Sequence, residues 1–170
     1  MSALQAPNKL QRSLMRLDEA PAFMRGFVQN IILRRAVPFT GTAGVQFVSL
    51  TPERVEVRLA NEHRVRNHIG SVHASAMNLL AETATGMAVG MNVRDDCLPL
   101  AKELSMAFKK RATGALKAVA TLTAEQRAAM QASDKGEVQV KVTVTDETGV
   151  EPVECAFTWA WVPSSRPAKN

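Results

Sequence analysis

The sequence predicts an α+β protein in which a curled antiparallel sheet wraps around one long central helix, with further helices before it. The apolar residues follow a helical period up to Phe39 and alternate with a period of two after it. Four predicted strands then follow one another with half-polar faces, which favours antiparallel pairing. Between Val72 and Val93 the one residue with a formal charge is Glu82, as expected for a helix that is buried on nearly every side.

Residues 7 to 36 are expected to form one or two helices, because large apolar residues recur there at helical spacing: Leu10, Leu14, Leu17, Phe23, Phe27, Ile31 and Ile32. We expect Pro21 and Gly26 to divide these helices and Pro38 to close the segment. The polar face of the first helix is basic. Such a helix can contact a membrane or a partner, but it more often packs on its own domain.

Alternating patterns predict strands at 45–50, 54–60, 101–112, 115–122, 136–146 and 153–162, with the long helix after the second strand. A turn is expected at Thr51-Pro52, and hairpin turns are expected at Thr113-Gly114 and Thr148-Gly149. Residues 123–136 predict an inserted helix that Thr123 caps, with Gln126 three residues on and Gly136 as the stop. The aromatic series Phe157, Trp159 and Trp161 is interpreted as sheet packing, not as a platform for a ligand.

These patterns divide the chain into an N-terminal helical extension (1–38), one domain (39–163) and a tail (164–170) that we expect to be frayed. With 46% hydrophobic and 22% charged residues, the 170-residue chain has the composition of a soluble globular protein. It contains no apolar run long enough for a transmembrane segment and no secretory signal core, so we expect a cytoplasmic protein.

The charges and cysteines exclude several functional classes. The net charge of +5 indicates a basic surface or an anionic partner, but no run of five basic residues and no Tyr is present, which argues against nucleic-acid binding. Cys97 and Cys155 are too few for a disulfide framework and are expected to be reduced. His63 and His68 have no partner pattern, so we expect no metal site.

Glu82 is the first candidate for chemistry. At 100° per residue it shares a narrow helical stripe of small or polar residues with Ser75, Asn78, Thr85, Gly86 and Val89. A carboxylate in apolar surroundings has a raised pKa and can act as a base, can bind a ligand, or can be held for structure alone. His73 lies nine residues earlier, about 180° around the helix. A site that uses both side chains would therefore need a second copy of the chain, unless His73 precedes the regular helix.

The segment "NHIGSVHASAMNLLAE" resembles the loop and helix signature of the PaaI-type hotdog thioesterases. That family has an Asn, a Gly and a His-Gly-Gly sequence before a central helix, with an acidic residue nine positions after the His. The matching positions here are Asn67, Gly70, His73 and Glu82. The order of strands and helix also matches from Gly41 to Val162. The whole sequence is most similar to a branch of this superfamily that is described as a domain of unknown function.

This resemblance implies a hotdog-fold homodimer, or a homotetramer built from two dimers, with active sites at the subunit interface. It implies that Glu82 acts as nucleophile or general base on an acyl-CoA thioester and that the Ala74 amide polarises the thioester carbonyl. It also implies that Asn67, with the Gly70 loop, comes from the opposing subunit and places the water. The start of a helix carries free N–H groups and a positive dipole end, which suits a developing oxyanion. Coenzyme A enters as part of the substrate, and no separate cofactor is expected.

The sequence departs from the family where the two glycines after the His are Ala74 and Ser75. The methyl group of Ala74 leaves less room for a thioester to approach the backbone amide of this residue. Lys102 has the same parity as Leu104, so it is expected to face the helix unless a bulge intervenes, and it could then pair with Glu82 and lower the pKa of that carboxyl. His73 is expected to orient the loop and not to carry a proton, while Asn67 can equally form a turn.

The basic group of Lys109, Lys110 and Arg111 ends a predicted strand, where relatives often bind coenzyme A phosphates. It can also be a solvated strand edge that charge protects from pairing. Three functions therefore stay open: an acyl-CoA thioesterase, an acyl-ligand binding protein without catalysis, and an interaction or structural subunit. The leading prediction is the acyl-CoA thioesterase, and the other two are its alternatives.

Overall fold

The computed structural model describes residues 6–17 and 21–164 of the chain. The predicted tail therefore lies outside the described residues, except for Ser164. Among the described residues the α-helices are α1 (Lys9–Leu17), α2 (Ala22–Ala36), α3 (Pro38–Ala43), α4 (Ala74–Gly90) and α5 (Ala124–Ala132), and a short 3₁₀ helix, η1, spans His63–Val65. The strands are β1 (Gln46–Leu50), β2 (Arg54–Leu59), β3 (Cys97–Phe108), β4 (Leu116–Thr121), β5 (Gly136–Asp146) and β6 (Val153–Pro163).

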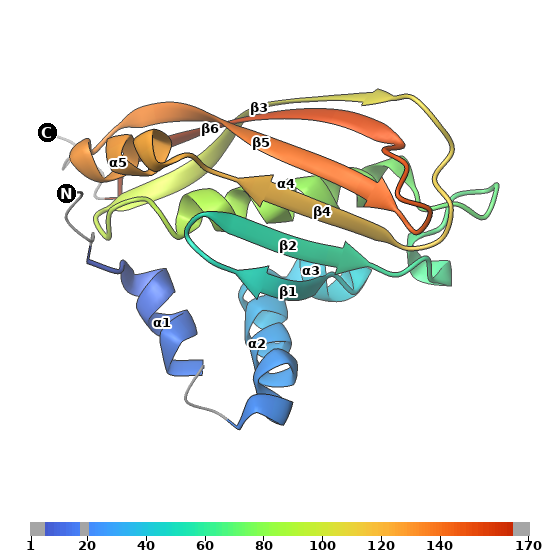
Figure 1. Ribbon diagram of the computed structural model, residues 1–170, viewed down its shortest axis with the longest axis horizontal. Helices are drawn as coiled ribbons and strands as arrows, with labels where there is room; N and C mark the ends of the chain where they lie inside the picture. The colour runs from blue at the N-terminus through green and yellow to red at the C-terminus, as the bar shows by residue number, and fades with distance from the viewer. Residues whose placement is uncertain (1–5, 18–20, 165–170) are drawn as a thin grey trace, which may run out of the picture.

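The strands form one antiparallel sheet with the order β1-β2-β4-β5-β6-β3. Figure 1 shows the sheet curling around α4, with the N-terminal helices projecting beside β1 and β2. The prediction of a curled antiparallel sheet around a central helix is confirmed. The expected hairpin at Thr113-Gly114 is wrong, because β3 and β4 are not neighbours and this segment crosses from one edge of the sheet to its middle.

The core forms between α4 and the concave face of the sheet. The buried side of α4 includes Leu80, Ala84 and Ala88, which meet the alternating inward residues of β4 and β5. Because Ala81, Ala84 and Ala88 on this side of the helix are small, the sheet can approach it closely there. Cys97 is buried and Cys155 is half-buried, and both are free thiols.

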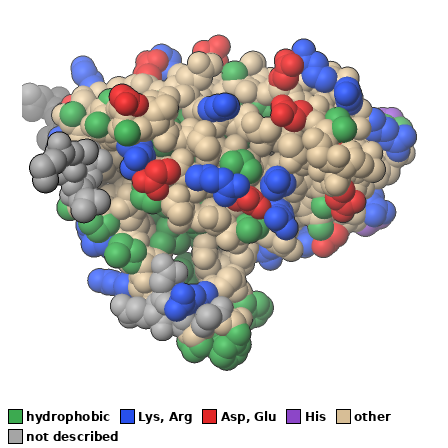
Figure 2. Space-filling view, in the orientation of Figure 1, with side chains coloured by type: hydrophobic (Ala, Val, Ile, Leu, Met, Phe, Trp, Pro, Cys, Tyr) green, Lys and Arg blue, Asp and Glu red, His purple; other side chains and the backbone are tan. Residues whose placement is uncertain are grey.

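The N-terminal region forms helices as predicted, but their boundaries differ from the expected ones. Pro21 precedes α2, whereas Gly26 lies inside that helix and does not divide it. Pro38 does not end the helical segment, because its fixed φ suits the first position of the next helix, α3. The first turns of α2 project from the body, so Phe23 and Phe27 are exposed, and hydrophobic side chains gather at the lower end of the molecule in Figure 2.

The inserted helix α5 begins with the predicted capping box between Thr123 and Gln126. Its end differs from the prediction: α5 ends at Ala132, and Gly136 instead begins β5. A Cβ on Gly136 would meet the indole of Trp161, so this glycine serves close packing and not helix termination. Among residues 6–17 and 21–164, no helix is both long and apolar enough to cross a membrane.

Candidate functional site

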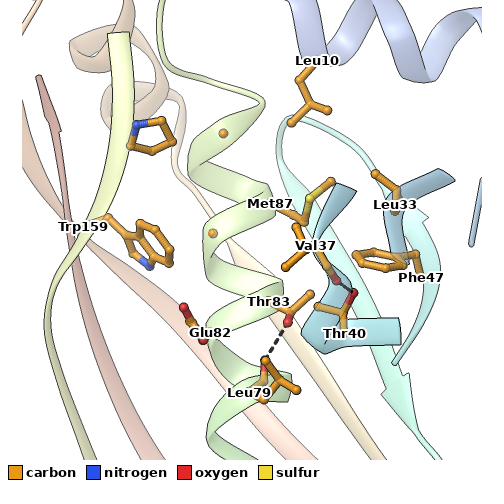
Figure 3. A pocket seen from close by; sticks show the side chains of 13 residues that line it. Leu10, Leu33, Val37, Thr40, Phe47, Leu79, Glu82, Thr83, Met87 and Trp159 are labelled. Atoms are coloured by element: carbon orange, nitrogen blue, oxygen red, sulfur yellow. Dashed lines mark hydrogen bonds between the residues drawn. The ribbon is translucent and has the colours of Figure 1, made fainter. Parts of the chain in front are cut away.

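A cavity of about 350 Å³ runs along one side of α4 and is shown in Figure 3. Its floor is the face of α4 that carries Glu82, Gly86 and Gly90. On one side stand Pro99 of β3 and Trp159 of β6. The remaining lining comes from α4 and from the N-terminal half of the chain: Leu79, Thr83, Met87, Leu10, Leu33, Val37, Thr40 and Phe47.

Glu82 contributes the one carboxylate among the residues that line this cavity. The side chain is half-buried, and removal from water raises the pKa of Glu82 above the usual value for a glutamic acid. Within the described residues, no side chain or backbone amide donates a hydrogen bond to it. It is therefore a carboxylate that neither a cation nor a donor stabilises in its charged form.

Lys102 does not supply the missing cation. The register between β3 and β6 shifts between Ala101 and Glu103, so a bulge at Lys102 reverses the expected direction of its side chain. Its ammonium group forms an ion pair with Glu137 on β5. The expected orientation toward Glu82 is therefore wrong in this chain, and the pKa of Glu82 is not lowered by a salt bridge.

Trp159 forms a wall of the cavity through a close fit with α4. Its indole N–H donates to the hydroxyl oxygen of the buried Thr85 at 3.0 Å. A Cβ on Gly86 would come within 2.8 Å of the Trp159 ring. The absence of a side chain at Gly86 therefore lets the indole lie against the helix one turn after Glu82.

The predicted loop residues lie at the other end of α4. The Asn67 side-chain oxygen accepts hydrogen bonds from the amides of Ile69 (3.1 Å) and Ser71 (3.0 Å), and Gly70 has a φ of 77°. Such a turn favours Asn and Gly at these positions. Arg111 donates to the Ile69 carbonyl at 2.6 Å and ties this loop to the end of β3.

His73 caps α4, and its Nδ1 accepts a hydrogen bond from the Ser75 amide at 3.0 Å. Ala74 is the first residue of the helix. Within the described residues its backbone N–H has no hydrogen-bond partner. The start of α4 therefore offers one free donor at the positive end of the helix dipole.

The three basic residues after β3 have different partners. Lys109 forms an exposed ion pair with Glu154 at 3.0 Å, and Arg111 holds the Ile69 carbonyl. Lys110 has no ion-pair partner among the described residues. It lines a cavity of about 150 Å³ together with Asn67, Ala74 and Arg111.

Those predicted site residues that line a cavity are therefore divided among three separate cavities within one chain. Glu82 lies in the large cavity, and Asn67, Ala74, Lys110 and Arg111 line the small one. His73 and Ser75 line a third cavity, of about 210 Å³. Asn78, one turn before Glu82, has a buried side-chain oxygen without a hydrogen-bond partner in the described structure. Of the predicted stripe, Thr85 and Val89 are buried in the core, and Gly86 shares the cavity with Glu82.

Sequence reasoning missed most of the cavity lining. The sequence pattern interprets Trp159 as sheet packing and Leu10 as part of the apolar face of a helix, and it assigns no role to Leu33 or Val37. The one available signal was the spacing of four between Glu82, Gly86 and Gly90, which places an acid and two glycines in line on one helix face. Among the described residues, no group of three His, Cys, Asp or Glu side chains could hold a metal ion.

The family comparison decides where this chain belongs. The model of a domain of unknown function, DUF4442, matches residues 27–162, which is most of the chain. The chain belongs to the DUF4442 family. None of the curated proteins matches its sequence.

Solved structures with the same fold include proteins named as thioesterases. A Pseudomonas aeruginosa protein of unknown function, named a probable thioesterase, is 25% identical with a TM-score of 0.73, and the match covers 80% of this chain and 94% of that one. A thioesterase from Haemophilus influenzae is 14% identical with a TM-score of 0.62 (77% and 87% covered). A mutant thioesterase from Pseudomonas aeruginosa is 18% identical with a TM-score of 0.63 (79% and 94% covered). This DUF4442 chain is therefore a thioesterase-like protein with the hotdog fold.

Proposed function

We propose that this protein hydrolyses acyl thioesters, with coenzyme A as the carrier and Glu82 as general base or nucleophile. The observation that carries the proposal is the unpartnered Glu82 carboxylate in the wall of an apolar cavity. Its raised pKa makes it a stronger base than an ordinary glutamate. The apolar walls offer a place for the acyl group beside it.

The second half of the proposed site is the free Ala74 amide, which would stabilise the oxyanion formed when the thioester carbonyl is attacked. Ala74 and Glu82 are eight residues apart on one helix, so about 12 Å of helix axis separates them. A single thioester group cannot contact both from one chain. We therefore propose a homodimer, or a homotetramer of two such dimers, in which Glu82 of one copy meets Ala74 and Asn67 of the other.

The β3 edge supports this assembly. β3 pairs with β6 on one side, and its pairing partners among the described strands leave its other edge free. Leu98, Leu100, Leu104 and Phe108 are exposed along it. A long apolar edge of this kind favours pairing with another strand. Joining two β3 edges would continue the sheet, and the buried oxygen of Asn78 would be available for a donor from the partner.

Lys110 is the best candidate in the basic group for a coenzyme A phosphate, because Lys109 and Arg111 already have partners. A role for Lys102 in binding is not supported by its ion pair with Glu137. The proposal keeps the cytoplasmic location that the sequence predicts.

The test is thiol release from a panel of short-, medium- and long-chain acyl-CoAs and aryl-CoAs, with wild type and Glu82→Gln assayed together. We expect Glu82→Gln to lower kcat by about 100- to 10,000-fold, the contribution typical of a general base. Glu125→Gln, which neutralises an exposed carboxylate on α5, is the matched control and should keep full activity.

The main alternative is an acyl-ligand binding protein without catalysis. The Ala74 methyl group, at a position where the resemblance implies glycine, favours it. That alternative predicts a rise in Tm with acyl-CoA, because a ligand selective for the folded state stabilises it, and no thiol release by folded wild type on any substrate. Such a result would overturn the proposed hydrolysis.

A further inference from the structure

The cavity beside α4 has a defined length. Its lining extends along the helix from Leu79 and Glu82 to Gly90 and includes Leu10 of α1. Figure 3 shows Leu10 and Leu79 at opposite ends of the group of lining side chains. The eight residues from Glu82 to Gly90 span about 12 Å. An extended hydrocarbon chain zigzags, so each carbon advances it by somewhat less than its bond length of about 1.5 Å, and roughly ten carbon atoms cover this distance.

The volume agrees with this length. An apolar cavity of about 150 Å³ accepts one benzene molecule. The cavity here, of about 350 Å³, is more than twice as large. It therefore has room for a medium-length alkyl chain.

The polarity of the cavity fixes the direction of such a ligand. Its lining is almost entirely apolar, and Glu82 at one end is its one charged side chain. A ligand with a negative head would place like charges together, which is unfavourable. An uncharged head such as a thioester can lie beside Glu82, with its apolar tail directed toward Gly90 and Leu10.

Helix α1 forms the far end of the cavity. A Cβ on Gly90 would come within 3.3 Å of the Leu10 side chain, so these two residues are already in close contact. The family match begins at residue 27, so α1 lies outside it. The end wall is therefore a feature of this chain beyond the matched part of the family.

Polar contacts hold α1 in this place. The buried Asn8 side chain donates to the carbonyls of Gly90 (2.9 Å) and Val93 (2.7 Å), and Gln11 donates to Met91 (2.7 Å). Arg12 pairs with Asp95 at 2.6 Å. None of the residues of α1 is buried. These bonds fix the helix at the C-terminal end of α4 and thereby set where the cavity stops.

We propose that α1 is the end wall of an acyl-chain pocket, and that the contact between Leu10 and Gly90 limits the chain to medium length, about eight to ten carbons by the helix rise above. The inference rests on the proposed function for the acyl nature of the ligand. It does not depend on whether the protein hydrolyses that ligand.

The experiment measures the binding of S-alkyl N-acetylcysteamine thioethers, from butyl to hexadecyl, by calorimetry. These probes lack both a thioester and coenzyme A, so they test the cavity even if hydrolysis is never observed. For wild type we expect the affinity to rise roughly fourfold per methylene group, the effect of burying each one. We expect the rise to stop between the decyl and dodecyl probes.

Three variants test the end wall. Leu10→Ala should open the end wall and bind the dodecyl probe roughly 15-fold more tightly than wild type does, because about two more methylene groups become buried. Gly90→Ala should fill the end of the pocket, so it should weaken the binding of the decyl probe but not that of the octyl probe. Leu14→Ala is the matched control: Leu14 also packs against the core from α1 but does not line the cavity, so it should leave the length profile unchanged.

Three results would overturn the proposal. The first is an affinity that keeps rising through the hexadecyl probe in wild type. The second is an equal change of profile in Leu10→Ala and Leu14→Ala. The third is no binding of any alkyl probe by folded wild type.

Discussion

Glu82 is the middle residue of α4, and the two halves of the helix on either side of it differ in how their polar groups are satisfied. The half from Ala74 begins at a loop whose backbone groups are already bonded to side chains. Asn67 accepts from the Ile69 amide, His73 accepts from the Ser75 amide, and Arg111 donates to the Ile69 carbonyl. The half that ends at Gly90 lines an apolar cavity and begins beside an unpartnered carboxylate. The first half offers a single free amide, and the second a carboxylate with a raised pKa and an apolar pocket. Under the proposed function, neither half alone is a complete site for a thioester.

After Glu82→Gln, the largest effect is expected from Ala74→Pro, which removes the free amide at the start of α4. Proline suits the first position of a helix, and His73 before it has the extended ψ of 144° that a following proline requires. The fold should therefore be kept, while hydrolysis falls about 100- to 1,000-fold, the effect of losing an oxyanion donor. Steady-state kinetics and circular dichroism measure the two consequences.

Ala74→Gly is the matched control, because it keeps the amide and removes the methyl group that narrows the approach. It should hydrolyse the substrate at least as fast as wild type. Full activity in Ala74→Pro would show that the start of α4 takes no part in the reaction.

The second prediction tests whether the two halves meet across a dimer. Glu82→Gln and Ala74→Pro are each expected to be nearly inactive. A mixture of the two that is unfolded and refolded together should recover about a quarter of wild-type activity. The reason is that half of the dimers in a random mixture contain one copy of each variant, and each such dimer has one intact site of two. Each variant refolded alone is the control. If both residues acted within one chain, no mixed dimer would hold an intact site and the mixture would stay inactive.

The third prediction concerns the cavity half of α4 and compares two helical glycines. Gly86→Ala puts a Cβ within 2.8 Å of the Trp159 ring, so the indole must shift and its bond to Thr85 is strained. We expect a loss of about 1–3 kcal/mol in the free energy of unfolding, the usual effect of overpacking. Gly26→Ala meets nothing within 4 Å. It should stabilise α2 by up to about 1 kcal/mol through helix propensity.

Urea unfolding of both variants measures this difference. Equal effects of the two substitutions would show that Trp159 does not depend on Gly86 for its place beside the helix.

The fourth prediction uses the raised pKa of Glu82. Burial disfavours the charged form of Glu82 in the folded state. At low pH the side chain is protonated, so its burial does not lower the stability of the fold. This stability is lost as the pH rises through the folded pKa. Glu82→Gln should therefore have a higher Tm than wild type at neutral pH, by a few degrees at most. The difference should vanish below the ordinary pKa of a glutamic acid, 4.5. Melting curves at a series of pH values measure it, and a lower Tm of the variant at neutral pH would contradict the cause given for the shift.

The architecture could be predicted because its signals are local. The alternation in β5 and β6 and the scarcity of charge in α4 each follow from neighbouring residues. Strand order could not be predicted this way: Thr113-Gly114 has turn residues, but whether a turn joins neighbouring strands depends on distant pairing. The cavity was missed for the same reason, since Leu10 and Gly90 are far apart in the sequence and meet only through bonds such as that between Gln11 and Met91.

Lys102 shows how one residue can change an electrostatic prediction. Parity along β3 directs it to the helix, and only a bulge between Ala101 and Glu103 turns it to Glu137. No sequence signal marks this bulge. The consequence for Glu82 is large, because a paired carboxylate would have a lowered pKa and would be a weaker base.

The smallest effect is therefore expected from Lys102→Ala. Its ion pair with Glu137 is exposed, so its loss should change the free energy of unfolding by at most about 1 kcal/mol. The pH dependence of hydrolysis should be the same as in wild type, because Glu82, the proposed base, has no contact with this lysine. Glu137→Gln, which breaks the same pair from the other side, should give the same result. A shift of the pH profile to higher pH in Lys102→Ala but not in Glu137→Gln would contradict this expectation. It would show that Lys102 lowers the pKa of Glu82 in the working protein. The carboxylate of Glu82 would then have a partner, as the polar groups of the first half of α4 do.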